Sequence, residues 1–244
     1  MKSAAFVLLA VSTALSSSVC LSQSSPPPTA PASRTSIVSV QELALSHKAS
    51  RSFQKGSALL LKGDPQASLS YFQAVIAEAP SFFGSYHNLG LALYRLGQID
   101  AAAENFQRAI DLTDGDFAPS LFGLSMVFYR QAEFAQAESL IRRGLFVQPK
   151  SGVGKYCLGL VEYSLGRTDD AERSAVEALS LDPSESDAYI LLARTHERQH
   201  NPSAVIADIQ SYLKLSRNGA LRPEALSLLG RAQQSLSVPS AALH

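Results

Sequence analysis

Apolar residues in the middle of the chain recur every three or four positions, and short polar or glycine-containing breaks separate these periodic runs. This spacing places the apolar side chains on one face of an α-helix. Each run covers about a dozen residues, or roughly three turns of helix. A representative pair of runs holds Leu89, Leu93 and Leu96, followed by Ala102, Phe106 and Ile110. The pattern predicts consecutive pairs of amphipathic helices rather than strands.

The predicted helix pairs repeat along the chain. Segments that begin at residues 49, 83, 118, 152 and 186 align over 34 or 35 residues each, with one extra residue near Asp116 and Phe117. The eighth residue of each segment is small, which lets two helix backbones approach closely. These residues are Gly56, Gly90, Ser125, Gly159 and Ala193. The first helix is expected to end at Gly63, Gly97 and Gly166 in three units, because glycine adopts a left-handed conformation with least strain.

This repeated pattern resembles the tetratricopeptide repeat, a 34-residue helix-turn-helix unit. The best match runs from Ser85 to Ile110, and Pro65 and Pro202 depart from the pattern because they fall in predicted interhelix turns. The resemblance implies an all-α, right-handed solenoid of about five units. Those units span residues 49–82, 83–117, 118–151, 152–185 and 186–219. Residues 220–244 are expected to form a capping helix and a tail, since an open stack needs a polar terminal helix.

The N-terminal residues differ in composition from the repeats. Residues 1–22 combine a positive start, an apolar run and a stretch of small residues, which is the layout of an export signal. The apolar run is shorter than the roughly 20 residues that cross a bilayer as a helix, so no transmembrane segment is expected in the mature chain. Residues 23–48 predict a Pro- and Ser-rich linker that could end in an N-terminal cap. The expectation is a periplasmic or secreted protein, with lipid attachment at Cys20 as the alternative.

The charge balance argues against one class of partner. The chain has 21 Lys and Arg residues and 21 Asp and Glu residues, so its formal net charge is zero. Binding to a nucleic acid needs clustered positive charge that neutralises phosphates, so no nucleic-acid partner is expected. The sequence holds two cysteines, too few for a disulfide framework. The partial phosphate-loop and serine-hydrolase patterns lack required residues, and no cofactor is predicted.

One stretch matches a zinc-peptidase motif letter by letter. His196, Glu197 and His200 form the pattern H-E-x-x-H, which on a helix aligns two histidines as zinc ligands beside a glutamate general base. In the repeat register, however, His196 takes a core position and His200 lies in the turn before Pro202. The motif also lacks the extension that supplies a third ligand. The expectation is that the protein is not an enzyme and holds no metal, with a zinc peptidase using residues 196–200 as an alternative.

The resemblance also indicates where a partner would bind. In tetratricopeptide-repeat proteins the first helices line an extended concave groove, through positions 2, 5, 9, 12 and 13 of each unit. The groove residues that carry over to this chain are Phe53, His87, Leu91, Tyr94, Arg95, Phe122, Met126, Tyr129, Arg130, Tyr156, Leu160, Tyr163, Ile190 and Arg194. Three tyrosines in this set recur one unit apart, and arginines lie beside them. Tyrosine and arginine dominate binding hot spots, which favours an extended or helical peptide as the ligand.

The predicted function is therefore a non-enzymatic scaffold or adaptor of the cell envelope that binds a protein or peptide segment in this groove. Members of the family that bind chaperones grip a carboxylate with Lys and Asn at positions 5 and 9, and this chain lacks that set. Two alternatives stay open. The tyrosines could instead pack adjacent helices, and the chain could self-associate through the groove or through an exposed end of the stack.

Overall fold

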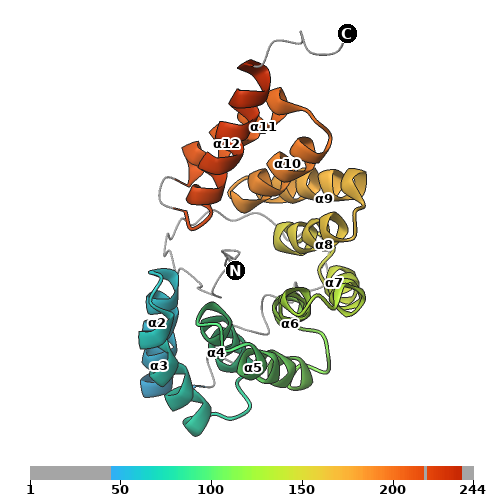
Figure 1. The fold of residues 1–244 in the computed structure, drawn as a ribbon. Coiled ribbons are helices and arrows are strands. Elements are labelled where there is room, and N and C mark those ends of the chain that lie inside the picture. Colours follow the sequence, from blue (N-terminus) through green and yellow to red (C-terminus); the bar gives the residue numbers. More distant parts are fainter. Residues whose placement is uncertain (1–44, 217–218, 238–244) are drawn as a thin grey trace, which may run out of the picture. The chain divides into compact units, whose positions relative to one another are not determined.

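The computed structural model describes residues 45–216 and 219–237, and every regular element within them is an α-helix (Figure 1). The predicted all-α class is confirmed. The predicted export signal, Cys20 and the linker up to residue 44 lie outside the described residues, as does the tail from residue 238. Among the described helices, none has both the length and the apolar character that a membrane span requires.

The chain divides between Gly115 and Asp116 into two compact units. The described helices of the N-terminal unit are α2 (His47–Leu61), α3 (Pro65–Glu78), α4 (Phe83–Arg95) and α5 (Ile99–Asp111). Those of the C-terminal unit are α6 (Ala118–Arg130), α7 (Phe134–Val147), α8 (Gly152–Ser164), α9 (Thr168–Leu181), α10 (Asp187–Arg198), α11 (Pro202–Leu215) and α12 (Arg222–Ser237). The extra residue that the sequence placed near Asp116 and Phe117 falls in the connection between α5 and α6.

Within each unit the helices pack as successive pairs. Each first helix contacts its own second helix, and each second helix contacts the first helix of the next pair, as α7 contacts α8 and α9 contacts α10. The first helices also contact one another, α6 with α8, α8 with α10 and α10 with α12. The C-terminal unit therefore has a layer of first helices and a layer of second helices, and α12 covers α10 and α11 as the predicted capping helix.

The two interhelix prolines do not lie in turns, as the sequence had suggested, but open the second helices. Pro65 and Pro202 are the first residues of α3 and α11. At this position a proline costs the helix no hydrogen bond, because the first backbone N–H groups of a helix have no partner inside the helix. The preceding residues cap these helices, since Asp64 accepts from the Ala67 N–H at 3.0 Å and Asn201 accepts from the Ala204 N–H at 3.2 Å.

The predicted glycine turns are confirmed. Gly63, Gly97 and Gly166 follow their first helices with φ angles of 83°, 79° and 78°. The same turn position is held by Ala132 in the third pair and by His200 in the fifth, with φ angles of 62° and 55°. A side chain with a Cβ atom is strained in this left-handed conformation. The backbone of the repeat therefore imposes the turn even where the sequence supplies no glycine.

This strain predicts that Ala132→Gly stabilises the protein. Relief of the left-handed Cβ contact is expected to raise the free energy of unfolding by about 1 kcal/mol, after allowance for the greater freedom of glycine in the unfolded chain. Urea denaturation followed by circular dichroism measures the change. Ala207→Gly is the matched control, because Ala207 is exposed within α11 and the same substitution there should cost about 1 kcal/mol. Equal losses at both sites would contradict the assignment of strain to Ala132.

Small residues bring the helices close together, as the sequence predicted. A Cβ atom added at Gly56 would lie 2.8 Å from a ring atom of Phe72, and one at Gly90 would lie 2.9 Å from the ring of Phe106. Phe72 and Phe106 come from the second helices α3 and α5 and are fully buried. The first helices α2 and α4 therefore each accept an aromatic ring of their second helix against the backbone of a glycine.

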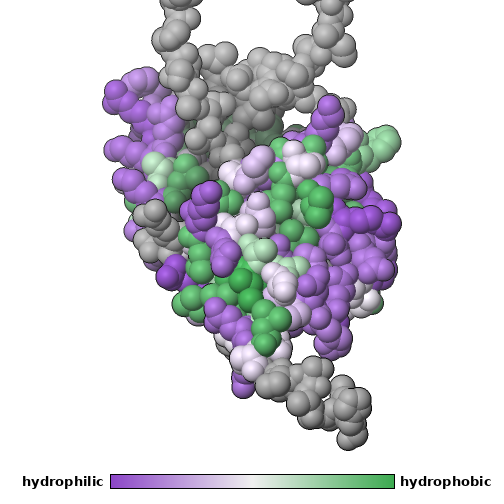
Figure 2. Space-filling model, turned by 90° about the horizontal axis from the view of Figure 1, so that it is seen from above, coloured by the Kyte–Doolittle hydropathy of each residue, from purple (hydrophilic) through white to green (hydrophobic). Residues whose placement is uncertain are grey.

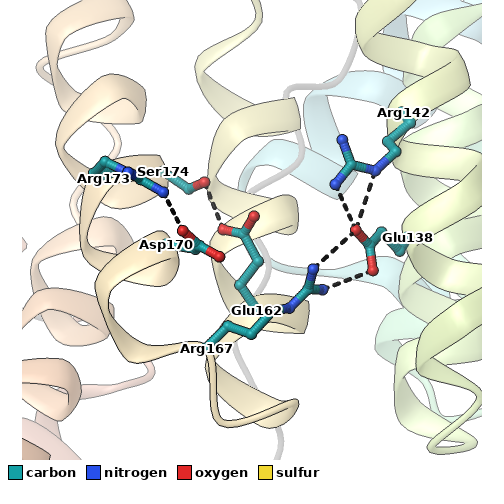
Figure 3. A network of polar contacts seen from close by, with 7 residues as sticks. All are labelled: Glu138, Arg142, Glu162, Arg167, Asp170, Arg173 and Ser174. Atoms are coloured by element: carbon teal, nitrogen blue, oxygen red, sulfur yellow. Dashed lines mark hydrogen bonds and ion pairs between the residues drawn. The ribbon is translucent and has the colours of Figure 1, made fainter.

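Charged side chains connect consecutive pairs at the surface of the C-terminal unit (Figure 3). Glu138 on α7 binds Arg142 of the same helix at 2.6 Å and Arg167, the N-cap residue of α9, at 2.7 Å. The bond to Arg167 is the main cause that lowers the pKa of Glu138. Glu162 on α8 is buried and accepts from the Ser174 hydroxyl at 2.6 Å. These contacts orient α9 against α7 and α8.

Candidate functional site

The first helix of each pair contributes to the surface where the sequence predicted that a partner binds. In the C-terminal unit this surface comes from α6, α8, α10 and α12, which contact one another in that order. In the N-terminal unit α2 and α4 are neighbours in the same way. We call this surface the first-helix face and describe it separately for the two units.

Most of the predicted groove residues are buried in this structure. Their side chains are at most 4% exposed. They are Phe53, His87, Leu91, Tyr94, Phe122, Met126, Tyr156, Leu160 and Ile190. Within the described residues, Phe53 and His87 pack against aromatic rings of neighbouring helices, and Phe122 packs against glycines of neighbouring helices.

Particular contacts explain this burial. The Phe53 ring packs edge-on against Phe82, with centroids 5.0 Å apart. The Phe122 ring lies where Cβ atoms on Gly144 of α7 and Gly154 of α8 would come within 2.5 Å of it. Burial lowers the pKa of His87 to about 3, so its imidazole is neutral and offers no positive charge to a partner. Glycines on the neighbouring helices α7 and α8 thus leave the space that buries the Phe122 ring. The apolar pattern of α6 alone does not show this space.

Two predicted tyrosines remain partly exposed, one on α6 and one on α8. The Tyr129 hydroxyl accepts a hydrogen bond from the Ser164 hydroxyl at 3.1 Å, and its ring lies 5.7 Å from that of Phe134. The Tyr163 ring carries the Arg198 guanidinium 3.5 Å from its centroid. Such a cation–π contact holds both side chains in place while leaving part of their surface open. Tyr129 and Tyr163 therefore form the aromatic part of the first-helix face in the C-terminal unit.

The arginines beside the tyrosines have structural partners of their own. Arg95 donates to the Leu60 carbonyl and Arg198 donates to the Tyr163 carbonyl, both at 2.6 Å. Both are the thirteenth residue of their unit, and each adds a hydrogen bond to a carbonyl at the C-terminal end of the preceding first helix that also accepts from the turn glycine, Gly63 or Gly166. Arg194 pairs with Glu224 of α12 at 2.6 Å. Arg130 is exposed at the end of α6.

Two buried carboxyl groups, Glu185 and Asp187, lie at the start of α10, and sequence reasoning missed them. Burial raises the pKa of Glu185 to about 8 and that of Asp187 to about 6, and the charge of Asp187 adds to the shift at Glu185. One oxygen of Asp187 is buried without a hydrogen-bond partner. Burial, followed by the charges of Asp187 and Glu185, also raises the pKa of Tyr156. The only signal in the sequence was the density of acidic residues between Asp182 and Asp187, which is equally typical of an exposed turn.

The structure does not align the H-E-x-x-H residues as a zinc site. The helix α10 ends at Arg198, and His200 lies beyond it in a left-handed conformation. The Nδ1 atom of His196 lies 2.6 Å from an Asp208 carboxylate oxygen, and Glu197 pairs with Arg231 at 2.6 Å. Among the described residues there is no group of three or more His, Cys, Asp or Glu side chains placed to hold a metal ion. The residues of the motif instead join α10 to α11 and α12.

The turn after α10 borders a shallow cavity of about 410 Å³. Its lining comes from that turn, from the start of α11 and from the C-terminal half of α12, and includes Glu197, His200 and Arg231. Glu197 and Arg231, which both line this cavity, form an ion pair with each other.

Comparison with known sequences agrees with the repeat architecture. The model of the tetratricopeptide-repeat family matches residues 83–116, and a second tetratricopeptide-repeat model matches residues 156–220. The human intraflagellar transport protein 70B is 33% identical over 100 residues, which are 38% of this chain and 15% of that protein. The human intraflagellar transport protein 70A is 32% identical over a stretch of the same length. The chain thus spans about a seventh of the length of these relatives.

Solved structures show the same fold. A tetratricopeptide-repeat protein from the thermophile Thermus thermophilus superposes with a TM-score of 0.65 at 24% identity, over 78% of this chain and all of that one. MamA from Desulfovibrio magneticus superposes with a TM-score of 0.53 at 19% identity, over 70% of this chain and 97% of that one. The fold is that of an all-α repeat protein built from helix pairs. The chain contains tetratricopeptide repeats, a kind of repeat that serves in protein-interaction scaffolds and is typically non-enzymatic.

Proposed function

We propose that this protein is an exported scaffold that binds a peptide or protein segment along the first-helix face of its C-terminal unit. Tyr129 and Tyr163 carry the proposal, because they lie one repeat apart on neighbouring first helices and keep part of their rings at the surface. Large aromatic side chains at a solvent-facing position supply binding area at little cost in side-chain entropy. Arg130, exposed on the same helix as Tyr129, supplies a charged contact at the edge.

Buried residues of the predicted groove and the contact with Arg198 help to hold the exposed tyrosines in one arrangement. Tyr156 and Phe122 are buried on the helices α8 and α6 that carry the exposed tyrosines, and Arg198 holds the ring of Tyr163 by its cation–π contact. A binding surface whose side chains are already held in one arrangement loses less conformational entropy when a partner binds. The proposed site is thus a narrow strip over α6 and α8 rather than a groove through all five pairs.

The site of action in this proposal is the bacterial cell envelope. Residues 1–22 carry the pattern of an export signal, and residues 23–48 carry that of a linker that would hold the repeats away from their point of attachment. Envelope and cytoplasmic extracts should therefore be compared as sources of the partner.

Replacement of both tyrosines, Tyr129→Ala and Tyr163→Ala, is expected to abolish partner capture while the protein stays helical. Each truncation removes an aromatic contact of the kind that contributes about 2 kcal/mol or more at a hot spot, so affinity should fall at least several hundredfold. The measurement is affinity capture from the two extracts, followed by titration of the captured partner and by circular dichroism of the variant.

The double variant Tyr71→Ala and Tyr86→Ala is the matched control. These tyrosines are partly exposed, and they lie on α3 and α4 of the N-terminal unit, whereas the proposed strip belongs to the C-terminal unit. The control should keep partner capture. Loss of helicity in the Tyr129 and Tyr163 variant would assign these residues to packing, and equal capture by both variants would contradict the proposed site.

A further inference from the structure

The start of α10 holds a buried carboxyl group that is incompletely paired. Asp187 is 4% exposed, and one of its oxygens has no hydrogen-bond partner. Its other oxygen accepts a long bond of 3.4 Å from the Ser186 hydroxyl. Buried polar atoms are normally paired, because a buried oxygen without a donor raises the free energy of the folded state. The open oxygen of Asp187 therefore indicates a missing donor.

The charged groups around this oxygen are mostly acidic. Glu185, two residues before Asp187, is 6% exposed, and Glu224 of α12 pairs with Arg194 at 2.6 Å. Burial raises the pKa of Asp187, the charge of Arg194 lowers it, and the charge of Glu224 raises it again. The charges that act on Glu185 come from Asp187 and Asp182, which are both acidic. We call Glu185, Asp187 and Glu224 the acidic cluster, in which one arginine faces three carboxyl groups.

The acidic cluster belongs to the first-helix face that carries the proposed binding strip. Asp187 and Arg194 are seven residues apart on α10, a spacing that places them on one side of the helix. They hold the second and ninth positions of their unit, which are groove positions in the family. Arg194 also interacts electrostatically with Tyr156 of α8 and with Tyr129 of α6. The cluster is therefore continuous with the strip over α6 and α8.

The cluster reaches solvent at the ion pair between Arg194 and Glu224. Their side chains are 23% and 29% exposed. Figure 2 looks down on the side where α12 lies in Figure 1, and hydrophilic surface is interspersed there with apolar surface. Because α10 and α12 follow α6 and α8 along the first-helix face, a segment that extends past the tyrosines would reach this pair.

We propose that the acidic cluster binds a lysine or arginine side chain of the segment that lies along the first-helix face. This inference rests on the proposed function, since it assigns a chemistry to the same bound segment. The cation would enter at Glu224 and donate to the open oxygen of Asp187. A neutral donor could satisfy that oxygen, but it would leave the excess of negative charge in place. Acids that are buried without full compensation are typical of functional sites.

Binding of a cation to this cluster should release a proton from Glu185. Burial and the neighbouring acids raise the pKa of Glu185 to about 8, so its carboxyl is mostly protonated at pH 7. A cation beside the carboxyl favours the ionised form and lowers this pKa. Affinity should therefore rise by up to about tenfold per pH unit between about pH 6 and pH 8.

Glu185 is the group whose titration dominates this pH range. Asp187, with a pKa raised to about 6, is mostly ionised above it, and Arg194 stays charged throughout. Burial raises the pKa of the other titratable groups that interact with the two acids, so these groups stay neutral. They are Tyr156 and Cys157 of α8 and Tyr212 of α11.

The probe is a blocked octapeptide of alternating alanine and arginine, because the charge of arginine is constant over these pH values. Calorimetric titration at low salt, in two buffers of different ionisation enthalpy, measures both the affinity and the proton release. Up to about one proton per bound peptide should be released at pH 7. The same peptide with glutamine in place of arginine should not bind.

Two substitutions separate the roles of the acids. Asp187→Asn removes the carboxylate that receives the cation and should weaken peptide binding at least tenfold. Glu185→Gln should remove most of the pH dependence and of the proton release. Glu104→Gln is the matched control, because Glu104 is exposed on α5 and its loss changes the net charge equally. Circular dichroism checks that each variant is folded.

Failure of the arginine peptide to bind, or equal weakening by Asp187→Asn and Glu104→Gln, would overturn the proposal. Proton release on addition of MgCl₂ but not of the peptide would assign the cluster to a metal ion instead and would also overturn it. The double variant Tyr129→Ala and Tyr163→Ala keeps all three acids. Unchanged partner capture by that variant would contradict the proposed function alone, whereas the peptide titration tests the acidic cluster.

Discussion

At about pH 8.5, Glu185→Gln is expected to stabilise the protein by several kcal/mol, and below about pH 4.5 the same substitution should change stability little. Burial raises the pKa of Glu185 from 4.5 to about 8 in the folded protein, and the nearby carboxylates of Asp187 and Asp182 add to this shift. Glutamine keeps the shape and size of the neutral acid but cannot ionise. The gain in unfolding free energy from the substitution therefore grows with pH as the Glu185 carboxyl of the unfolded native chain ionises.

The sign follows from comparison of the two states. Below pH 4.5 the Glu185 carboxyl is neutral in both the folded and the unfolded chain, so it does not disfavour folding. Between pH 4.5 and about 8 the unfolded chain ionises freely while the folded chain holds the proton. The folded state loses stability through this whole window, by on the order of 3 to 5 kcal/mol at its upper end. Asp187, with its pKa raised to about 6, contributes a smaller loss of the same sign.

Urea denaturation at a series of pH values between about 4 and 9 tests this expectation, with circular dichroism as the signal. The unfolding free energies of the native chain and of Glu185→Gln should coincide at low pH and diverge as pH rises. Glu133→Gln is the control, since Glu133 is exposed at the start of α7. Parallel curves for the native chain and Glu185→Gln would show that Glu185 is not the buried acid described above.

Gly154→Ala is expected to destabilise the protein by about 3 kcal/mol, because the added methyl group has no room. It would lie 2.5 Å from the Phe122 ring and 2.7 Å from a methyl carbon of Leu145. The ring cannot move aside towards α7, where the backbone of Gly144 already contacts it. Interiors packed to this density transmit such an overlap into shifts of neighbouring helices.

Two further variants isolate the cause of the effect. Phe122→Leu in the Gly154→Ala background should recover part of the lost stability, because leucine leaves space where the ring edge stood. Gly230→Ala, studied in dilute solution, should instead stabilise by about 1 kcal/mol, since that helical glycine has open space around it. Thermal or urea denaturation measures all three. A cost of Gly154→Ala no larger than that of an exposed substitution would contradict the close packing of α6, α7 and α8.

The sequence predicted the repeat well because the repeat is a local pattern. The helix pairs follow from apolar spacing, and the turn at Gly97 follows from the conformational freedom of glycine. The same logic failed at Pro65, which was assigned to a turn although it opens α3. Proline is compatible with both positions, and only the hydrogen bond between Asp64 and the start of the helix separates them.

The candidate site was harder to predict, because exposure depends on neighbouring helix pairs. Phe122 and Tyr129 both belong to the first helix α6 and both matched groove positions of the family. Phe122 is buried because glycines on α7 and α8 leave space for its ring, whereas Tyr129 stays partly exposed beside Ser164. Neither glycine is close to Phe122 in the sequence. Likewise the role of Arg95 depends on a carbonyl 35 residues away, at Leu60.

By itself the sequence determined the class of this protein, since a 34-residue period of apolar and small residues allows little other than stacked helix pairs. It also placed the capping helix. Tertiary structure alone decided which residues of each helix remain at the surface, why Glu185 keeps its proton and that Gly230 lies uncovered. The physical reason is that burial, desolvation and close approach depend on atoms contributed by other helices, whereas periodicity depends on the helix that carries it.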